Sequence, residues 1–425
     1  MIDNHNFHWR EGFFYNYPKK RDLFFELVKE IESRQIISLT GLRRTGKTTI
    51  LKQLIDHIIQ NAKREHVLFY SFDEDQPKID EIIHEYENKT GISLFDANYK
   101  VYIFLDEIQK LENWQNQIKY YYDNYDNVKF FISGSASLFI KKHIRESLAG
   151  RIYEFILNPL SFTEFLVFKG RKEMINKPDL FSTEIEKEFH VYQKRQFIET
   201  ISESEEKIGQ YTKSIIEKIV FQDIPKIFPI ENEEILIRIL KIIASNPGML
   251  SNYDELAKEI GINRITLSNY FFYLEESFMI KKIYNFSKNR LTSEKKMKKI
   301  YLSTASFFSF LNNGIDEPKL IENLLISLIN ARFFWRTPQK DEVDIVVEKN
   351  NEIIPVEIKY RNIISRKDAK PLIKFCENFG IDKAIMITKN YEKEEEIRED
   401  KRLIKIIYIP AWKFALNPSR YLGHG

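Results

Sequence analysis

The eight residues from Gly41 to Thr48 read GLRRTGKT, which fits the pattern G-x-x-x-x-G-K-[ST]. Glycines at both ends let the backbone curl around an anion, and its amides attract phosphate together with the positive end of a following helix. Lys47 supplies a cation for the β- and γ-phosphates of a nucleotide, and the Thr48 hydroxyl suits Mg²⁺. We therefore predict an ATP–Mg²⁺ site here. The residues expected to contact the nucleotide are Gly41, Leu42, Arg43, Arg44, Thr45, Gly46, Lys47, Thr48 and Thr49.

Two adjacent acids, Asp106 and Glu107, directly follow the apolar run VYIFL. Adjacent acids also occur in ordinary loops, but a phosphate loop earlier in the same chain favours a catalytic pair. Asp106 is then expected to hold Mg²⁺ through water, and Glu107 to polarise the attacking water. Ser133 ends another apolar run, VKFFI, and either senses the γ-phosphate or only forms a turn.

A second group of candidate residues lies near the C-terminus, at Asp344 and in the triplet Glu357-x-Lys359. A two-residue turn at Asn350-Asn351 would set Asp344 opposite Glu357 and Glu342 opposite Lys359, all on one face of a hairpin. Opposed residues have Cβ atoms about 5 Å apart, and facing carboxylates repel each other. The pattern therefore favours a divalent cation, Mg²⁺ or Mn²⁺, between the two acids.

The remaining members of this predicted metal site follow from the same hairpin. Lys359 could hold the attacking water or neutralise a phosphate, and Glu322, on a preceding helix, could be a third ligand. The alternative is a surface hairpin in which Glu342 and Lys359 form an ordinary ion pair. Pro355 cannot donate to a ladder, so the strand needs an edge or a bulge there and its register could slip by one residue.

Strands alternating with helices are expected to position the first group of residues. The apolar runs read as strands are 35–40, 66–72, 101–105, 128–132 and 152–157, and residues 21–32 have helical periodicity. Alternation of this kind predicts an α/β fold with a parallel sheet, helices on both faces and the ligand at the carboxyl ends of the strands.

The middle of the chain changes character twice. Residues 166–232 are helical and charged, and we interpret them as a helical lid and connector. Residues 233–305 contain three helices with Gly261 in a tight turn, followed by a basic loop, which predicts a winged helix-turn-helix. Its expected partner is double-stranded DNA, contacted by Arg264, Asn269 and the Lys295–Lys299 cluster. A winged helix that only packs domains together is the alternative.

The last segment, 306–425, is a second α/β region. A helix at 317–330 precedes strands at 333–335, 342–347 and 352–360, a helix ending at Phe379, and strands at 383–388 and 404–409. These elements begin in the order α-β-β-β-α-β, which places Asp344, Glu357 and Lys359 on neighbouring strands.

Composition sets limits on the whole chain. At 425 residues it is long enough for about two to four domains, and 43% hydrophobic residues can form real cores. A net charge of +3 restricts any nucleic-acid surface to a local patch. One cysteine excludes an internal disulfide and suits a reducing compartment. With no long apolar run and no signal peptide, the expected location is the cytoplasm, away from membranes.

The motifs together resemble the prokaryotic AAA-type ATPases of the archaeal-ATPase family. The resemblance rests on GLRRTGKT, YIFLDEIQ, ISGSAS, LAGRI and NPLSFTEF, within residues 30–165. It implies that Arg151 reaches the ATP of a neighbouring subunit, and therefore a homo-oligomer. The element order and acids of the C-terminal segment resemble the PD-(D/E)XK nuclease fold, which members of that ATPase family often carry.

These observations predict four domains: an ATPase core at 1–165, a helical lid and connector at 166–232, a winged helix at 233–305, and a nuclease-like domain at 306–425. We expect an ATP-hydrolysing protein that acts on DNA. Two hypotheses remain for its C-terminal domain, which is either a metal-dependent nuclease or a non-catalytic scaffold in an ATP-switched DNA-binding protein.

Overall fold

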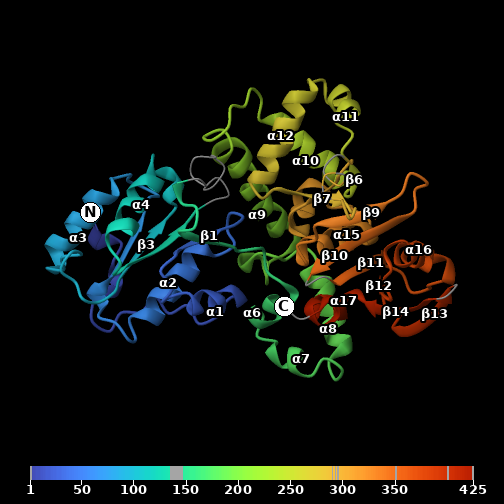
Figure 1. The fold of residues 1–425 in the computed structure, drawn as a ribbon, viewed down its shortest axis with the longest axis horizontal. Coiled ribbons are helices and arrows are strands. Elements are labelled where there is room, and N and C mark those ends of the chain that lie inside the picture. Colours follow the sequence, from blue (N-terminus) through green and yellow to red (C-terminus); the bar gives the residue numbers. More distant parts are fainter. Residues whose placement is uncertain are drawn as a thin grey trace. The chain divides into compact units, whose positions relative to one another are not determined.

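The computed structural model divides the chain into two units, Met1–Pro159 and Leu160–Gly425, which are described one at a time (Figure 1). The residues that the structure describes are 2–134, 147–289, 291, 293, 296–349, 352–399 and 402–423. Ser135, Lys295 and the Asn350-Asn351 turn lie outside these ranges.

The first unit is built on a five-stranded sheet in which every neighbouring pair of strands is parallel. Its order is β2-β3-β4-β1-β5. The strands are β1 (Ile36–Thr40), β2 (Val67–Ser71), β3 (Val101–Asp106), β4 (Val128–Ser133) and β5 (Ile152–Ile156). The helices are α1 (Asp22–Lys29), α2 (Lys47–Ile58), α3 (Ile79–Thr90) and α4 (Trp114–Asn124). The predicted parallel α/β core is thus confirmed.

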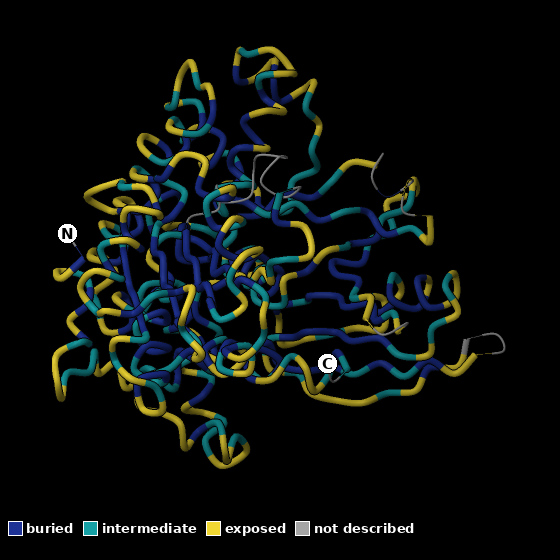
Figure 2. The backbone as a smooth tube through the Cα atoms, turned by 60° about the vertical axis from the view of Figure 1, so that its left-hand side comes forward, coloured by how far each residue is buried: buried dark blue, intermediate teal, exposed yellow. Residues whose placement is uncertain are grey.

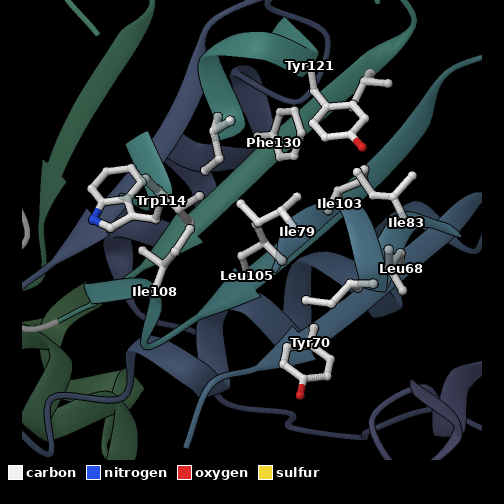
Figure 3. Packing of buried hydrophobic residues seen from close by; sticks show 14 of the residues in the cluster. Leu68, Tyr70, Ile79, Ile83, Ile103, Leu105, Ile108, Trp114, Tyr121 and Phe130 are labelled. Carbon is white, nitrogen blue, oxygen red and sulfur yellow. The ribbon is translucent and has the colours of Figure 1, made fainter. Parts of the chain in front are cut away.

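Both faces of this sheet are covered by apolar side chains. Ile103 and Leu105 of β3 belong to the cluster shown in Figure 3, which also contains Trp114 and Phe130. Phe104, between them in sequence, belongs to the cluster on the other side of the sheet. Successive strand residues point to opposite faces, so a fully apolar strand is what a sheet covered on both sides requires.

In the second unit, helices α6 to α9 come first among the described elements, and α10 to α12 follow. The helices are α6 (Phe162–Phe168), α7 (Lys172–Asn176), α8 (Ser182–Tyr192), α9 (Glu205–Lys218), α10 (Glu234–Ser245), α11 (Tyr253–Ile260), α12 (Arg264–Glu276), α14 (Phe308–Leu311), α15 (Glu317–Leu328), α16 (Lys370–Phe379), α17 (Ala411–Leu416) and α18 (Pro418–Leu422). Gly261 separates α11 from α12 with φ 84°, a left-handed conformation that glycine adopts without strain.

The strands of this unit form one nine-stranded sheet in the order β13-β14-β12-β11-β10-β9-β7-β8-β6. They are β6 (Met249–Leu250), β7 (Ile280–Asn285), β8 (Lys299–Leu302), β9 (Phe333–Arg336), β10 (Glu342–Lys349), β11 (Glu352–Lys359), β12 (Lys383–Thr388), β13 (Lys393–Glu399) and β14 (Arg402–Pro410). β7 and β9 pair in parallel at Tyr284 and Phe333. The sheet therefore contains strands from both sides of the predicted domain boundary at residue 305. Figure 2 colours each described residue by its burial, and many of the exposed residues lie at turns of the chain.

The hairpin β10–β11 has the register expected from its turn. Ile345 pairs with Val356 and Lys349 with Glu352. Pro355 pairs with Val346 in this ladder, while the parallel ladder between β11 and β12 begins one residue later, at Val356. The register therefore does not slip at the proline. Of the helices that the structure describes, none is long and apolar enough to cross a membrane.

Candidate nucleotide site and C-terminal acidic cluster

The phosphate loop connects β1 to α2, and its two glycines are structurally required. Gly41 has φ 145°, and a Cβ atom on it would lie only 2.4 Å from the Leu157 carbonyl oxygen. Any other residue would therefore force the backbone of one segment to move. Gly46 has φ 98° and directly precedes the first turn of α2, so the amides at that end of the helix point into the loop.

Lys47 extends its ammonium group back into the curve of the loop. Its side chain is buried, and Nζ donates to the carbonyl oxygens of Gly41 at 3.1 Å and Leu42 at 3.2 Å. The Thr45 hydroxyl donates to the same Leu42 carbonyl at 2.8 Å, which narrows the turn. A cation held inside a ring of backbone groups suits a phosphate chain. Among the other predicted contact residues, Arg44 is exposed and has φ 66°.

Asp106 lies at the carboxyl end of β3, between hydroxyl groups from two other elements. Thr48, in the first turn of α2, donates to Asp106 Oδ2 at 2.7 Å, and Ser133, at the end of β4, donates to Oδ1. Burial raises the pKa of Asp106, while the bonds from Ser133 and Thr48 oppose that rise. Hydroxyl and carboxylate oxygens are the ligands that Mg²⁺ prefers, and nucleotide phosphates supply others. These side chains therefore fit a nucleotide-bound Mg²⁺.

Glu107 immediately follows β3 and has φ 54°. Its Oε2 accepts a hydrogen bond of 2.6 Å from Gln109 Nε2, and Gln109 Oε1 is buried without a partner among the described residues. Sequence reasoning did not single out Gln109. The sequence offered one clue to its role, which is an amide side chain two residues after Glu107. Gln109 lies in the short 3-10 helix Ile108–Lys110. Gln109 therefore fixes the direction of the carboxylate that we expect to act on water.

Arg151 lies away from the phosphate loop of its own chain. It immediately precedes β5, whose first residue pairs with Ile36 at the start of β1, whereas the loop follows the end of β1. Its Nε and Nη2 donate to the two carboxylate oxygens of Asp123 at 2.8 and 3.2 Å. This position excludes a role at its own nucleotide, so the predicted role in a neighbouring subunit stays a prediction.

Arg21 is a further residue of this region that the sequence did not reveal. It is buried, with 4% of its surface exposed, and precedes α1. Its Nη1 donates to the Thr45 carbonyl in the phosphate loop at 2.9 Å, and its Nη2 donates to the Asn158 carbonyl at 2.8 Å. One guanidinium therefore joins the loop to the last residues of the first unit. Only the burial of an arginine could have indicated this, and burial is not visible in a sequence.

In the second unit, Asp344 and Glu357 are both buried, as the hairpin register implies. Asp344 Oδ2 accepts from the backbone N–H of Ile358 at 2.9 Å. Glu357 Oε1 accepts from the Lys359 ammonium, while Glu357 Oε2 has no partner in the part of the chain that the structure describes. Burial and the charge of Asp344 raise the pKa of Glu357 to about 8, against the effect of Lys359.

Lys299 of β8 contributes an unexpected cation to this region. Its side chain is 6% exposed, and its Nζ lies 2.6 Å from Glu342 Oε1, 3.6 Å from Asp344 Oδ1 and 3.7 Å from Glu322 Oε1. Burial opposes its charge, yet the three carboxylates raise its pKa above the ordinary value. The Tyr301 hydroxyl also donates to Glu322 Oε1 at 2.6 Å. We call Glu322, Glu342, Asp344, Glu357 and Lys299 the C-terminal acidic cluster.

The predicted C-terminal metal site, with Glu322, Asp344 and Glu357 as ligands, stays a prediction. Among the described residues, no group of three or more histidine, cysteine, aspartate or glutamate side chains could hold a metal ion. Glu322 accepts from Tyr301 and faces Lys299 instead of completing a shell with Asp344 and Glu357. Burial and the charge of Asp344 raise the pKa of Glu322 to about 7.

Two other expectations about charged residues are corrected here. Lys299 was grouped with residues that contact DNA, but it is buried and paired with acids, so that assignment is wrong. The alternative ion pair between Glu342 and Lys359 is not among the ion pairs of the described residues, in which Glu342 pairs with Lys299 and Arg336 while Lys359 pairs with Glu357.

Three segments of the chain match known family models. Residues 33–166 match a model described as an AAA domain. Residues 199–317 match a domain of unknown function (DUF8612), and residues 320–412 match another domain of unknown function (DUF4143). The first match spans the parallel sheet, the phosphate loop and the pair Asp106–Glu107. It supports the AAA-type ATPase core that the sequence predicted.

Similar proteins and structures were also found. The uncharacterized protein MJ1544 of Methanocaldococcus jannaschii is 27% identical, over 93% of this chain and 91% of that protein. An uncharacterized protein of Haemophilus influenzae is 24% identical, over 91% and 96%. Among solved structures, Aeropyrum pernix Orc1 in complex with DNA has a TM-score of 0.31 at 12% identity, covering 73% of this chain and 96% of that one. AMPPCP-bound DnaA from Aquifex aeolicus has a TM-score of 0.29 at 15% identity, covering 60% and 86%.

Proposed function

We propose that this protein binds ATP with Mg²⁺ at the loop Gly41–Thr48 and hydrolyses it. The observation that carries the proposal is the meeting of Lys47, Thr48 and Asp106 at the carboxyl ends of β1 and β3, with Thr48 bonded to Asp106. A parallel sheet places ligands at this edge. The match of residues 33–166 to an AAA domain supports the same reading.

Each side chain of the site has a separate task in this proposal. The Lys47 ammonium binds β- and γ-phosphate oxygens, and Thr48 and Asp106 hold the metal ion directly or through water. When bound, Mg²⁺ neutralises charge that develops on the phosphates. Glu107, held by Gln109, orients a water molecule in line with the γ-phosphate and attracts its proton.

The test is Mg²⁺-dependent release of phosphate from ATP by the full chain. Lys47→Ala should lower turnover about 100-fold or more, because a positioned charge at the transferred phosphate is lost. The control is Lys63→Ala, which removes an exposed lysine beyond the end of α2. Turnover in Lys47→Ala equal to that of Lys63→Ala would contradict the proposal.

We propose double-stranded DNA as a second ligand, held by the segment α10 to β8. Among the described residues, its order of helix, strand, two helices and two antiparallel strands supports a winged helix. Arg264 and Asn269 on α12 are exposed, as is Lys296 before β8. An exposed helix face can contact a groove, and exposed cations can contact phosphates.

Binding of a labelled duplex tests this second proposal. Affinity should fall steeply with salt and vary little with sequence, because phosphate contacts dominate such binding. Lys296→Glu should weaken binding roughly tenfold at low salt, whereas Lys370→Glu, a charge reversal at an exposed position on α16, should not. Salt-insensitive binding, or none, would leave this segment with a packing role.

Nucleic-acid cleavage is not part of this proposal. The residues expected to perform it are Asp344, Glu357 and Lys359, with Glu322 as a further ligand. Among the described residues, the unpartnered Glu357 Oε2 is a feature that favours a metal ion there. Against it stands a buried lysine whose ammonium faces three of the acids. The scaffold hypothesis therefore fits the C-terminal acidic cluster better.

A further inference from the structure

We propose that Lys299 is the resident cation of the C-terminal acidic cluster and takes the place that a divalent metal ion would hold. The cluster then joins β8, β10 and α15 through a protein cation. This inference is independent of the ATP site, which lies in the other unit.

The Lys299 ammonium lies among three carboxylates. Its Nζ is 2.6 Å from Glu342 Oε1, 3.6 Å from Asp344 Oδ1 and 3.7 Å from Glu322 Oε1. These distances describe one close ion pair and two longer ones. The side chain that carries this charge is only 6% exposed, so the ammonium fills the space beside these acids where another cation would have to enter.

Local contacts hold the strand that carries Lys299. Asn323 on α15 bonds to both backbone groups of Leu302, accepting from its N–H and donating to its carbonyl, each at 2.9 Å. Tyr301 lies between Lys299 and Leu302 on β8, and its hydroxyl donates to Glu322 Oε1 at 2.6 Å. Because β8 is fixed to α15 at these points, the Lys299 side chain enters the cluster from a defined position.

Charge balance explains why this lysine excludes a metal ion. The half-buried Glu342 is shared between Lys299 and Arg336, Asp344 faces Lys299 and the buried Glu357 is paired with Lys359, so each of these acids has a cation nearby. A divalent ion would have to enter beside an ammonium that is already desolvated, and like charges at such distances repel strongly. Removing Lys299 reverses the situation, because buried carboxylates without a partner are costly.

The experiment measures Mn²⁺ binding by the nucleotide-free full chain, through the electron paramagnetic resonance signal of free Mn²⁺. All proteins carry Asp106→Asn, so that the ATP site loses the carboxylate that we expect to hold its metal ion. With Lys299 present, no Mn²⁺ should bind and Mn²⁺ should not change the melting temperature. Lys299→Met should acquire one Mn²⁺ and be stabilised by it, whereas Lys299→Arg and the exposed control Lys296→Met should not.

Two results would overturn the inference. The first is one Mn²⁺ bound by the protein that retains Lys299 and lost on Asp344→Asn, which decides the question even if Lys299→Met does not fold. The second is a folded Lys299→Met of unchanged melting temperature that binds no Mn²⁺, because the acids would then need no cation. Neither result bears on ATP hydrolysis, so failure here is distinguishable from failure of the proposed function.

Discussion

Asp106 shows how single residues prepare the proposed ATP site. Its two oxygens accept separately from Ser133 and Thr48, so the carboxylate cannot rotate freely. A hydrogen bond to a charged group contributes about 1.5–3 kcal/mol, enough to keep a buried acid in one orientation. The groups that we expect to hold Mg²⁺ are therefore ordered before any ligand arrives.

Gln109 provides a prediction at the same scale. Gln109→Ala should lower ATP turnover roughly tenfold and leave ATP affinity near the parental value, because Glu107 loses the bond that directs it. The measurement is kcat together with equilibrium binding of labelled ATP. Asn116→Ala, at an exposed amide on α4, is the matched control. A change in affinity without a change in kcat would show that Gln109 acts on binding instead.

Residues close in sequence were predictable, and residues joined only by the fold were not. Lys47 and Thr48 are placed by the spacing of one loop, and Asp106 by the end of one strand. Lys299 is the last of several lysines in a basic segment, and that local composition led to the prediction that it contacts DNA. Its partners Glu342 and Asp344 come from β10, which is not its neighbour in the sheet. The sequence around Lys299 does not indicate that its side chain pairs with these acids.

Elements were predictable wherever an apolar run or a helical period marks them. β12 spans Lys383–Thr388, the same residues as predicted, because its centre is fully buried. β13, Lys393–Glu399, was missed. Its sequence KEEEIRE lacks alternation, and it lies at the sheet edge with β14 as its only neighbour. Charged edge strands of this kind resist pairing with other chains, and they leave no apolar signal.

The hairpin β10–β11 separates what a turn determines from what its surroundings determine. The turn length predicted the register, which the structure confirms from Ile345–Val356 onward. Pro355 is tolerated because β12 begins to pair only at Val356. The cations paired with the acids, however, come from β8 (Lys299) and β9 (Arg336) as well as from the hairpin itself (Lys359), so the turn could not predict whether a metal ion or a lysine would lie beside them.

At the scale of the molecule, four sequence regions correspond to two units. The boundary after Pro159 lies close to the predicted end of the ATPase core at residue 165. The boundary at 305 falls inside one sheet, because β7 pairs with β9. Composition shows where a chain changes from one kind of segment to another. It does not show which distant segments pair as strands of one sheet. The four-domain division therefore stays a prediction.

Assembly is the prediction that belongs to this scale. Arg151→Ala should lower ATPase turnover roughly 10³-fold while ATP still binds, because an arginine supplied by a neighbour stabilises the transferred phosphate. Mixing Arg151→Ala with Lys47→Ala should restore part of the activity, since each subunit supplies what the other lacks. Asp123→Ala, which removes only the observed partner of Arg151, is the control. Full turnover from a demonstrated monomer would contradict the prediction.

The central claim is that the loop Gly41–Thr48 binds ATP, which is hydrolysed at Asp106 and Glu107. The most direct test is to identify the nucleotide that stays bound to the variant Glu107→Gln. The purified variant is incubated with labelled Mg-ATP, separated from free nucleotide, and its bound nucleotide is identified. We predict stoichiometric, uncleaved ATP, with ADP on the parent protein and no nucleotide on Lys47→Ala. ADP on Glu107→Gln at the parental rate, or ATP retained by Lys47→Ala, would contradict the account.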